Sequence, residues 1–403
     1  MNGRRAAAPA ATAVAAAAAA VLGAACENKR VRPAASGSAG AGSGSGGSAG
    51  APAAATGSAE DSPSSAEVAR LPGVLWFVQD RPSHRLVRLA GGARLEVTTP
   101  GGDLFPSGTA LPDGRLVAIA SRGDGSPGSE QVALVGPDGA VERIGPTGAM
   151  VRSPAVDPRG RWIAIAANLD GHSDLYRLEL PPARAAAPGS LPRLTTDPQG
   201  NFEPALLGDS ALAFTSSRDG DSEIYRMPAA GGRAQRLTAF HRDDWGPVPS
   251  PDGAAIAFLS DREGRPRIFL MAADGTGARR LTGRTDADRD ESSPVWSPDG
   301  RSIAYLVEGG GEATLWLRDV ASGRERLLTP LHARDAEPCF SPDGAWLAVS
   351  RGRTAHDGDI WVIPVPRSTA GAGADPAAAP APPGPALRVT ATPGLERLPR
   401  WVR

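Results

Sequence analysis

The sequence has few cysteines and histidines and no excess of either charge. It contains two cysteines, five histidines and three tyrosines among 403 residues, and its 43 basic and 44 acidic residues leave a formal net charge of −1. Without a basic surplus we expect no nucleic-acid partner. A disulfide would have to tie Cys26, near the N-terminus, to Cys339. We expect Cys339 to be a small buried strand residue instead.

The sequence also lacks a strongly apolar run long enough to span a membrane. Two arginines at positions 4 and 5 precede an uncharged, alanine-dominated stretch that ends in Gly23-Ala24-Ala25-Cys26. This layout predicts a secretory signal over residues 1–26. Small residues directly before a cysteine resemble the lipobox of bacterial lipoproteins, although Leu22 stands one position early. The resemblance implies lipidation of Cys26, and the alternative is plain secretion with cleavage nearby.

Large apolar side chains are nearly absent from residues 27–70, which consist mainly of Gly, Ala, Ser and Pro. Such a segment cannot bury a core, so we expect a disordered tether. A flexible chain of this length spans about 35–40 Å on average. With Cys26 lipidated, residues 71–403 would be exported across the inner membrane and held in the periplasm, anchored to the outer membrane.

From residue 71 onward the chain repeats a motif in which Ser-Pro-Asp-Gly separates two apolar segments. The clearest copies occupy residues 247–259, 294–306 and 338–349. Proline fixes the first corner of a turn and glycine accepts the positive φ that closes it, so each copy predicts a hairpin. A second turn rich in Asp and Gly follows, and then an outer segment that ends in Leu-Thr. A repeat of about 40–50 residues with four strands predicts an all-β fold, the β-propeller.

The two ends of the chain are complementary parts of one repeat. Residues 74–99 read as the second, third and fourth strands of a blade, and Glu396–Arg403 reads as an inner strand. We expect this C-terminal strand to pair with the N-terminal three and close the ring, which removes exposed sheet edges. The inner-strand prolines predict about seven four-stranded blades, or six if one weak unit is degenerate.

The repeat Pro-x-Trp/Phe-Ser-Pro-Asp-Gly, followed by Arg-Asp-Gly and then Ile-Tyr or Ile-Trp, resembles TolB-type propeller repeats over residues 73–403. TolB itself carries an α/β domain before its blades, which residues 27–70 cannot supply. The resemblance therefore implies a TolB-like propeller lipoprotein without that domain. It implies work in the cell envelope, where the partner would be a protein or peptide.

Catalytic motifs are weak. The Gly-x-Ser-x-Gly string at residues 46–50 lies in the expected tether, whereas a hydrolase needs it on a strand-to-helix turn. His241 and His332 each precede an inner-strand proline by six residues, and some propeller lyases hold a metal with channel histidines. No third histidine occupies the equivalent place, so we expect no metal or cofactor. An enzyme acting on polysaccharide or peptide in the channel remains the alternative.

A ring of polar residues is the better candidate site. Three residues before the inner-strand prolines stand Asp103, Asn201, Asp244, Glu291, Asp335 and Glu396, with Val151 as the exception. Two interpretations are open: these groups bind backbone where each blade enters the ring, or their free carboxylates form a negative funnel for a cation, an amine or a basic peptide. We predict a monomeric, non-catalytic propeller that binds its partner through this channel mouth.

Overall fold

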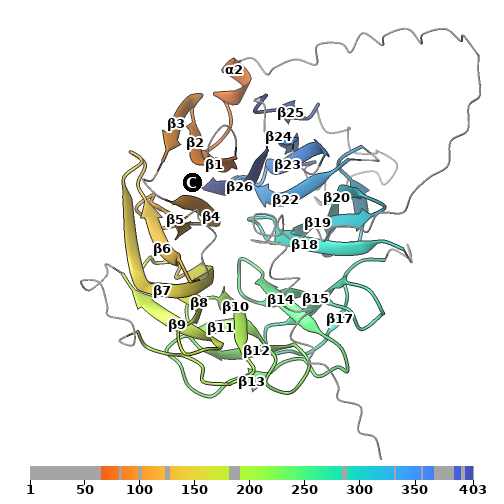
Figure 1. Cartoon of the computed structure of the whole chain (residues 1–403). Coiled ribbons are helices and arrows are strands. Elements are labelled where there is room, and N and C mark those ends of the chain that lie inside the picture. The colour runs from red at the N-terminus through yellow and green to blue at the C-terminus, as the bar shows by residue number, and fades with distance from the viewer. Residues whose placement is uncertain are drawn as a thin grey trace, which may run out of the picture. The chain divides into compact units, whose positions relative to one another are not determined.

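Figure 1 shows the computed structural model of the chain, which describes residues 65–80, 84–98, 102–122, 128–180, 191–283, 288–330, 333–354, 357–366, 385–391 and 395–402. The chain divides into two units, residues 1–62 and 63–403. The expected signal segment, Cys26 and most of the expected tether lie outside the described residues. The helix α2 (Ser65–Val68) falls inside the range expected for the tether. In the described part of the chain, no helix is long and apolar enough to cross a membrane.

The described residues form antiparallel sheets arranged around a common centre (Figure 1). The first sheet has the order β26 (Glu396–Val402), β1 (Val74–Gln79), β2 (Arg85–Ala90), β3 (Ala93–Val97). Strands β1 and β26 pair from Val74 with Val402 to Gln79 with Glu396, interrupted by a bulge. The predicted pairing of the C-terminal strand with the three N-terminal strands is therefore confirmed.

Four more sheets have four strands each, in chain order from the inner to the outer edge. The fourth sheet consists of β10 (Asn201–Leu207), β11 (Ala211–Ser216), β12 (Glu223–Pro228) and β13 (Gln235–Arg236), and the fifth of β14 (Asp244–Pro249), β15 (Ala255–Ser260), β16 (Arg267–Ala272) and β17 (Arg279–Arg280). The sixth sheet consists of β18 (Asp290–Trp296), β19 (Ser302–Gly309), β20 (Glu312–Asp319) and β21 (Glu325–Leu327). The seventh consists of β22 (Asp335–Phe340), β23 (Trp346–Thr354), β24 (Asp357–Pro364) and β25 (Leu387–Arg388).

The second and third sheets share a strand. Strands β4 (Asp103–Ala110), β5 (Leu116–Ser121), β6 (Glu130–Val135), β7 (Val141–Val156), β8 (Trp162–Asn168) and β9 (Ser173–Glu179) form one six-stranded sheet. The first half of β7 pairs with β6, and its second half pairs with β8. The repeat predicted a separate outer strand and inner strand here, but residues 141–156 form a single strand. Counting each half of β7 separately gives seven sheets.

The Ser-Pro-Asp-Gly turn has the same hydrogen bonds in each clear copy. In the fifth sheet, Asp252 Oδ1 accepts hydrogen bonds from the Ser250 hydroxyl, at 2.5 Å, and from the Ala254 backbone N–H, at 3.0 Å. Gly253 has a φ of 70° and donates its N–H to the Ser250 carbonyl, at 2.8 Å. Gly is required because only it adopts this φ without strain. The motif therefore reverses the chain between an inner strand and the second strand of its sheet.

Apolar side chains from neighbouring sheets pack against each other. Between the third and fourth sheets, Trp162 and Leu175 lie in one cluster with Phe214 and Tyr225. Second strands are buried along almost their whole length, as in β11, because each is covered on both faces. This burial explains the continuous apolar runs of the repeat.

Candidate functional site

The six predicted channel-mouth residues begin the inner strands. Five are the first residues of β4, β10, β14, β22 and β26, and Glu291 is the second residue of β18. They therefore lie at the same end of their sheets, as the repeat predicted. Asp103 is partly exposed, whereas the other five are no more than 2% exposed.

Arginines contact three of these residues: Arg218 and Arg262 come from the turn after the second strand, and Arg351 lies within the second strand β23. Arg262 donates to Asp244 at 2.6 Å, Arg351 donates to Asp335 at 2.6 Å, and Arg218 donates to the side-chain oxygen of Asn201 at 2.9 Å. The two aspartates are thus paired with positive charge inside the protein.

Each of these arginines also stacks on an aromatic ring of its own sheet. The guanidinium carbon lies 4.4 Å from the ring centre of Phe269 for Arg262, 5.0 Å from that of Trp361 for Arg351, and 4.4 Å from that of Tyr225 for Arg218. Cation–π contacts of this kind fix the guanidinium in place. The guanidinium group that contacts each of these three inner strands is therefore fixed in position.

Glu291 and Glu396 are also tied to the protein. Glu291 accepts hydrogen bonds from the Thr282 hydroxyl, at 2.6 Å, and from the backbone N–H of Ile268, at 2.9 Å. The backbone carbonyl of Glu396 accepts a hydrogen bond from the Ser350 hydroxyl, at 2.5 Å. These contacts favour the first interpretation of the ring, in which its members anchor the strands. A binding role for Asp103, Asn201, Asp244, Glu291, Asp335 and Glu396 stays a prediction.

Asp244 has the most perturbed environment in the ring. Burial raises its pKa to about 6, although hydrogen bonding and the charge of Arg262 act in the opposite direction. Its Oδ1 atom is buried without a hydrogen-bond partner. Burial of this aspartate thus favours its protonated form.

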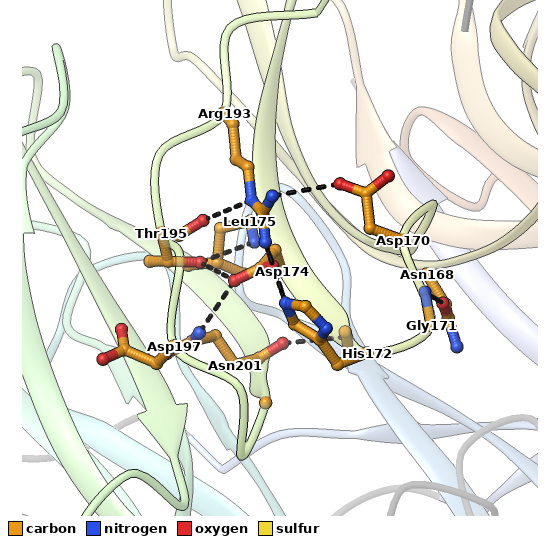
Figure 2. A network of polar contacts seen from close by, with 12 residues as sticks. Asn168, Asp170, Gly171, His172, Asp174, Leu175, Arg193, Thr195, Asp197 and Asn201 are labelled. Atoms are coloured by element: carbon orange, nitrogen blue, oxygen red, sulfur yellow. Dashed lines mark hydrogen bonds and ion pairs between the residues drawn. The ribbon is translucent and has the colours of Figure 1, made fainter. Parts of the chain in front are cut away.

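The Leu-Thr ending of each outer segment serves a buried carboxylate (Figure 2). In the third sheet the Thr195 hydroxyl donates to Asp174 at 2.8 Å and accepts the backbone N–H of Leu175 at 2.9 Å. Arg193, two residues before the threonine, donates to the same Asp174 carboxylate. The threonine therefore satisfies a third-strand N–H and orients the acid, and the arginine balances its charge.

The same arrangement recurs in other sheets. Glu223, Thr238 and Arg236 occupy these places in the fourth sheet. In the fifth sheet, Thr282 and Arg280 contact Glu291, which lies on the inner strand β18 of the sixth sheet. The backbone N–H of the third strand meets a threonine hydroxyl again at Leu315 and at Ile360. The motif Arg-Leu-Thr thus has a structural role, because the same contacts recur in several sheets, whereas a functional site would occur once.

The third sheet adds a histidine to this network. His172 Nε2 lies 3.1 Å from Asp174 Oδ2 and 2.8 Å from Arg193 Nη2, and Arg193 also reaches Asp170 at 3.0 Å (Figure 2). In Figure 2, His172, Asp170 and Asp174 all contact Arg193, so the arginine links the histidine to two carboxylates.

Two carboxylates that the sequence patterns did not single out lie on inner strands, each two residues after a predicted channel-mouth residue. Glu203 and Glu337 each stand directly before an inner-strand proline and have φ values of 51° and 57°. Burial raises the pKa of both carboxyls. Glu203 accepts the backbone N–H of Gly246 at 2.9 Å, and Glu337 accepts that of Leu398. Each donor precedes the proline of the next inner strand, so these glutamates link neighbouring sheets.

Of the two histidines considered for a metal site, only His241 lies in the described residues. His241 lies on an exposed turn, with its ring 6.1 Å from that of Phe240, and His332 lies outside the described residues. Across the described ranges, no three His, Cys, Asp or Glu side chains form a group that could hold a metal ion.

A pocket of about 570 Å³ opens at the outer part of the fourth sheet. It is lined by Arg218, Asp219, Tyr225, Arg233, Ala234, Gln235 and Arg236. Pockets that take ligands are commonly about 300–1,000 Å³. Three guanidinium groups against one carboxylate make its lining basic. The sequence patterns did not indicate this pocket, because its residues belong to two separate turns and two strands.

Comparison with known proteins agrees with this architecture. A family model described as the TolB beta propeller domain matches residues 211–348. The "Protein TolB homolog" of Chlorobium chlorochromatii is 33% identical over 128 residues, 31% of this chain and 27% of that protein. The "Uncharacterized peptidase YuxL" of Bacillus subtilis is 35% identical over 214 residues, 51% of this chain and 30% of that protein. The matched regions thus span less than a third of these relatives.

A solved oligogalacturonate lyase from Vibrio parahaemolyticus superposes with a TM-score of 0.54 at 12% identity, covering 72% of this chain and 86% of the lyase. At this identity the likeness concerns the fold alone. The radial four-stranded sheets with buried second strands define a β-propeller. The repeats of residues 211–348 are similar to the TolB beta propeller domain, the resemblance that the sequence predicted.

Proposed function

We propose that this chain is a non-catalytic binding propeller of the cell envelope, exported to the periplasm and anchored through lipidated Cys26. The observation that carries the proposal is that polar groups on the inner strands are already bound by other groups of the protein. Asp244 and Asp335 are buried against arginines, and Glu203 and Glu337 hold backbone of the neighbouring sheet. Groups committed in this way build a rigid scaffold, and a partner would contact side chains that do not repeat from sheet to sheet.

The envelope location is supported by the sequence alone. The arrangement of residues 1–26 fits an exported lipoprotein, and the TolB-like repeats fit a periplasmic role. The test is metabolic labelling of the full chain with palmitate, followed by membrane flotation. We expect label and flotation for the wild type and for Cys339→Ser, and neither for Cys26→Ser. Equal labelling of Cys26→Ser would contradict the anchor.

The alternative is an enzyme, which the likeness to a peptidase and to a lyase favours. Assays with aminoacyl arylamides, and with oligogalacturonate plus Mn²⁺, separate the two classes. A binding propeller is expected to turn over neither substrate and to cross-link reproducibly to one envelope component in intact cells. Turnover that falls in His241→Ala but not in His84→Ala would instead support the enzyme.

A further inference from the structure

The connection from β13 to β14 contacts the turn between β15 and β16. Residues 237–243 form the connection, and residues 261–266 form the turn. The backbone N–H of Asp261 donates to the Asp243 carbonyl at 3.2 Å, and Arg242 Nη1 lies 3.9 Å from Asp261 Oδ2. Both segments lie at the end of the fifth sheet where β14 begins, because its strands are antiparallel. They therefore form one continuous surface beside the start of this inner strand.

Phe240 presents an exposed aromatic ring on this surface. It is the large apolar side chain found exposed among the described residues, at 42%. Its backbone N–H donates to Glu223 Oε1 at 2.8 Å, and the Arg262 guanidinium carbon lies 4.8 Å from its ring centre. An exposed ring positioned in this way is an anchor for a partner, because little conformational entropy is lost when it becomes buried.

Three carboxylates lie beside this ring with little positive charge around them. Asp261 Oδ1 is buried and finds no hydrogen-bond partner among the described residues. Asp243 accepts the backbone N–H of Ser222 at 2.8 Å but forms no ion pair within the described ranges, and the exposed Asp221, which precedes Ser222, forms none there either. Burial and the charge of Asp243 raise the pKa of Asp261, as expected for a carboxylate that lacks a close cation.

The arginines of this surface do not neutralise the three carboxylates. Arg262 donates to the buried Asp244 at 2.6 Å, so its charge is already balanced. Arg242 is exposed, and its 3.9 Å distance from Asp261 is near the outer limit of an ion pair. The surface therefore keeps an excess of negative charge. Because carboxylates and the face of an aromatic ring both attract cations, the two features favour a positively charged partner.

The ring and the carboxylates are within reach of one short peptide. Phe240 and Asp243 are three residues apart on one connection, so their Cα atoms are at most about 11 Å apart. The backbone of Asp261 is hydrogen-bonded to that of Asp243, and the next residue, Arg262, contacts the Phe240 ring. Alternate residues of an extended peptide point to the same side about 7 Å apart. A segment of about three or four residues therefore spans the surface.

We infer that Phe240, Asp243 and Asp261, which we call the Phe240 rim, bind a basic peptide segment. An Arg or Lys of the partner stacks on the Phe240 ring, and the two carboxylates balance its charge and that of a second basic residue two positions away. This inference rests on the proposed function, in which the propeller binds a protein partner. It keeps the basic ligand expected at the channel mouth but moves the contact from the buried Asp244 to the rim beside it.

The test uses the purified full chain and fluorescent octapeptide pools read by anisotropy. Each pool has either Arg/Lys or Gln at two positions separated by one residue, and uncharged residues elsewhere. We expect the Arg/Lys pools to bind, and their affinity to fall about tenfold or more in Phe240→Ser and in Asp261→Lys, a loss typical of a central interface residue. Asp261→Asn, which keeps the size of the side chain, should weaken binding about threefold.

Asp274→Lys is the matched control, since Asp274 is an exposed residue of the turn between β16 and β17, at the other end of the fifth sheet. It should bind the pools as the wild type does. Thermal unfolding of each variant shows whether it is folded, and if Asp261→Lys is not, Asp261→Asn and Phe240→Ser decide. The inference is overturned if the Gln pools bind as well as the Arg/Lys pools, if no pool binds, or if Asp274→Lys weakens binding as much as Asp261→Lys.

Two further measurements separate this site from its alternatives. Free argininamide should displace the pools only weakly, and displacement at the concentration of the peptides themselves would overturn the inference, because the rim would then take a small cation. Unchanged cross-linking of Phe240→Ser and Asp261→Lys to the envelope component would overturn this site alone. Substrate turnover in the assays above would overturn the proposed function.

Discussion

The carboxylate of Glu337 accepts a hydrogen bond from the backbone N–H of Leu398, so a side chain of one inner strand holds the backbone of the next. Both residues stand directly before a proline, and both have a positive φ, 57° and 54°. Glu203 and Gly246 repeat the contact between the fourth and fifth sheets. The bulge before the proline thus serves as the joint between neighbouring sheets.

Replacing Glu337 by Gln should make stability less dependent on pH. Burial raises the pKa of Glu337, so the folded protein binds its proton more tightly than the unfolded chain does. Its contribution is therefore most favourable below the unfolded carboxyl pKa and is lost as pH rises through the folded value. Glu337→Gln keeps an acceptor for Leu398, and its melting temperature should fall less than that of the wild type between pH 5 and pH 8. Glu337→Ala, which removes the acceptor, should cost about 1–3 kcal/mol near pH 5, where Glu337 of the folded wild type retains its proton. An equal loss of stability in Glu337→Gln and Glu337→Ala would contradict the role of residue 337 as a hydrogen-bond acceptor.

Asp244→Asn should remove a second pH-dependent contribution to stability, which is lost between about pH 4 and pH 6. Because burial raises the pKa of Asp244 from 3.8 to about 6, its stabilising contribution is complete below about pH 4 and declines as pH rises through 6. The difference in melting temperature between variant and wild type, measured by calorimetry from pH 4 to pH 8, should change between about pH 4 and pH 6 and level off above pH 6. Asp252→Asn is the control, because burial is not the main influence on that exposed turn residue. A flat difference curve for Asp244→Asn would show that the group does not titrate there.

Thr238→Val should destabilise the fourth sheet. The Thr238 hydroxyl donates to Glu223 and accepts the backbone N–H of Ile224 at 2.9 Å, and both partners are buried. Each unsatisfied buried group costs about 1–3 kcal/mol, so urea unfolding should show a loss in this range or larger. Thr238→Ser should lose much less. Thr276→Val, at an exposed turn threonine, should change stability little. Comparable losses for both valine variants would argue against the buried network.

Gly73→Ala and Gly246→Ala should differ although both glycines have a similar φ, 67° and 62°. A Cβ on Gly73 would press into the Val402 carbonyl oxygen of β26, whereas on Gly246 its nearest neighbour is Glu203 Oε2 at 3.9 Å. Gly246→Ala should therefore cost only the backbone strain, about 1–2 kcal/mol. Gly73→Ala should cost more and should speed hydrogen exchange in the first sheet. A smaller effect at Gly73 than at Gly246 would mean that β26 shifts freely.

The repeat could be predicted from the sequence because each turn is stabilised by contacts among its own residues. Ser-Pro-Asp-Gly fixes a hairpin through its own side-chain contacts, as at Ser250 and Asp252, and buried second strands need continuous apolar runs. Even the pairing of the two chain ends followed from counting strands. The 16-residue strand β7 was missed because the loss of a turn between two sheets leaves no local signal.

The candidate site depended on contacts that sequence spacing does not reveal. The position of Asp244 three residues before a proline predicted where it lies, but only the fold shows that Arg262 reaches it and that its carboxylate is buried. The architecture, by contrast, was determined by the sequence alone, because turns and strand burial are set within each repeat. Tertiary structure decided which charges are paired and which, such as Arg233, face solvent, because pairing joins residues from separate turns and strands whose distance is fixed only when the sheets pack.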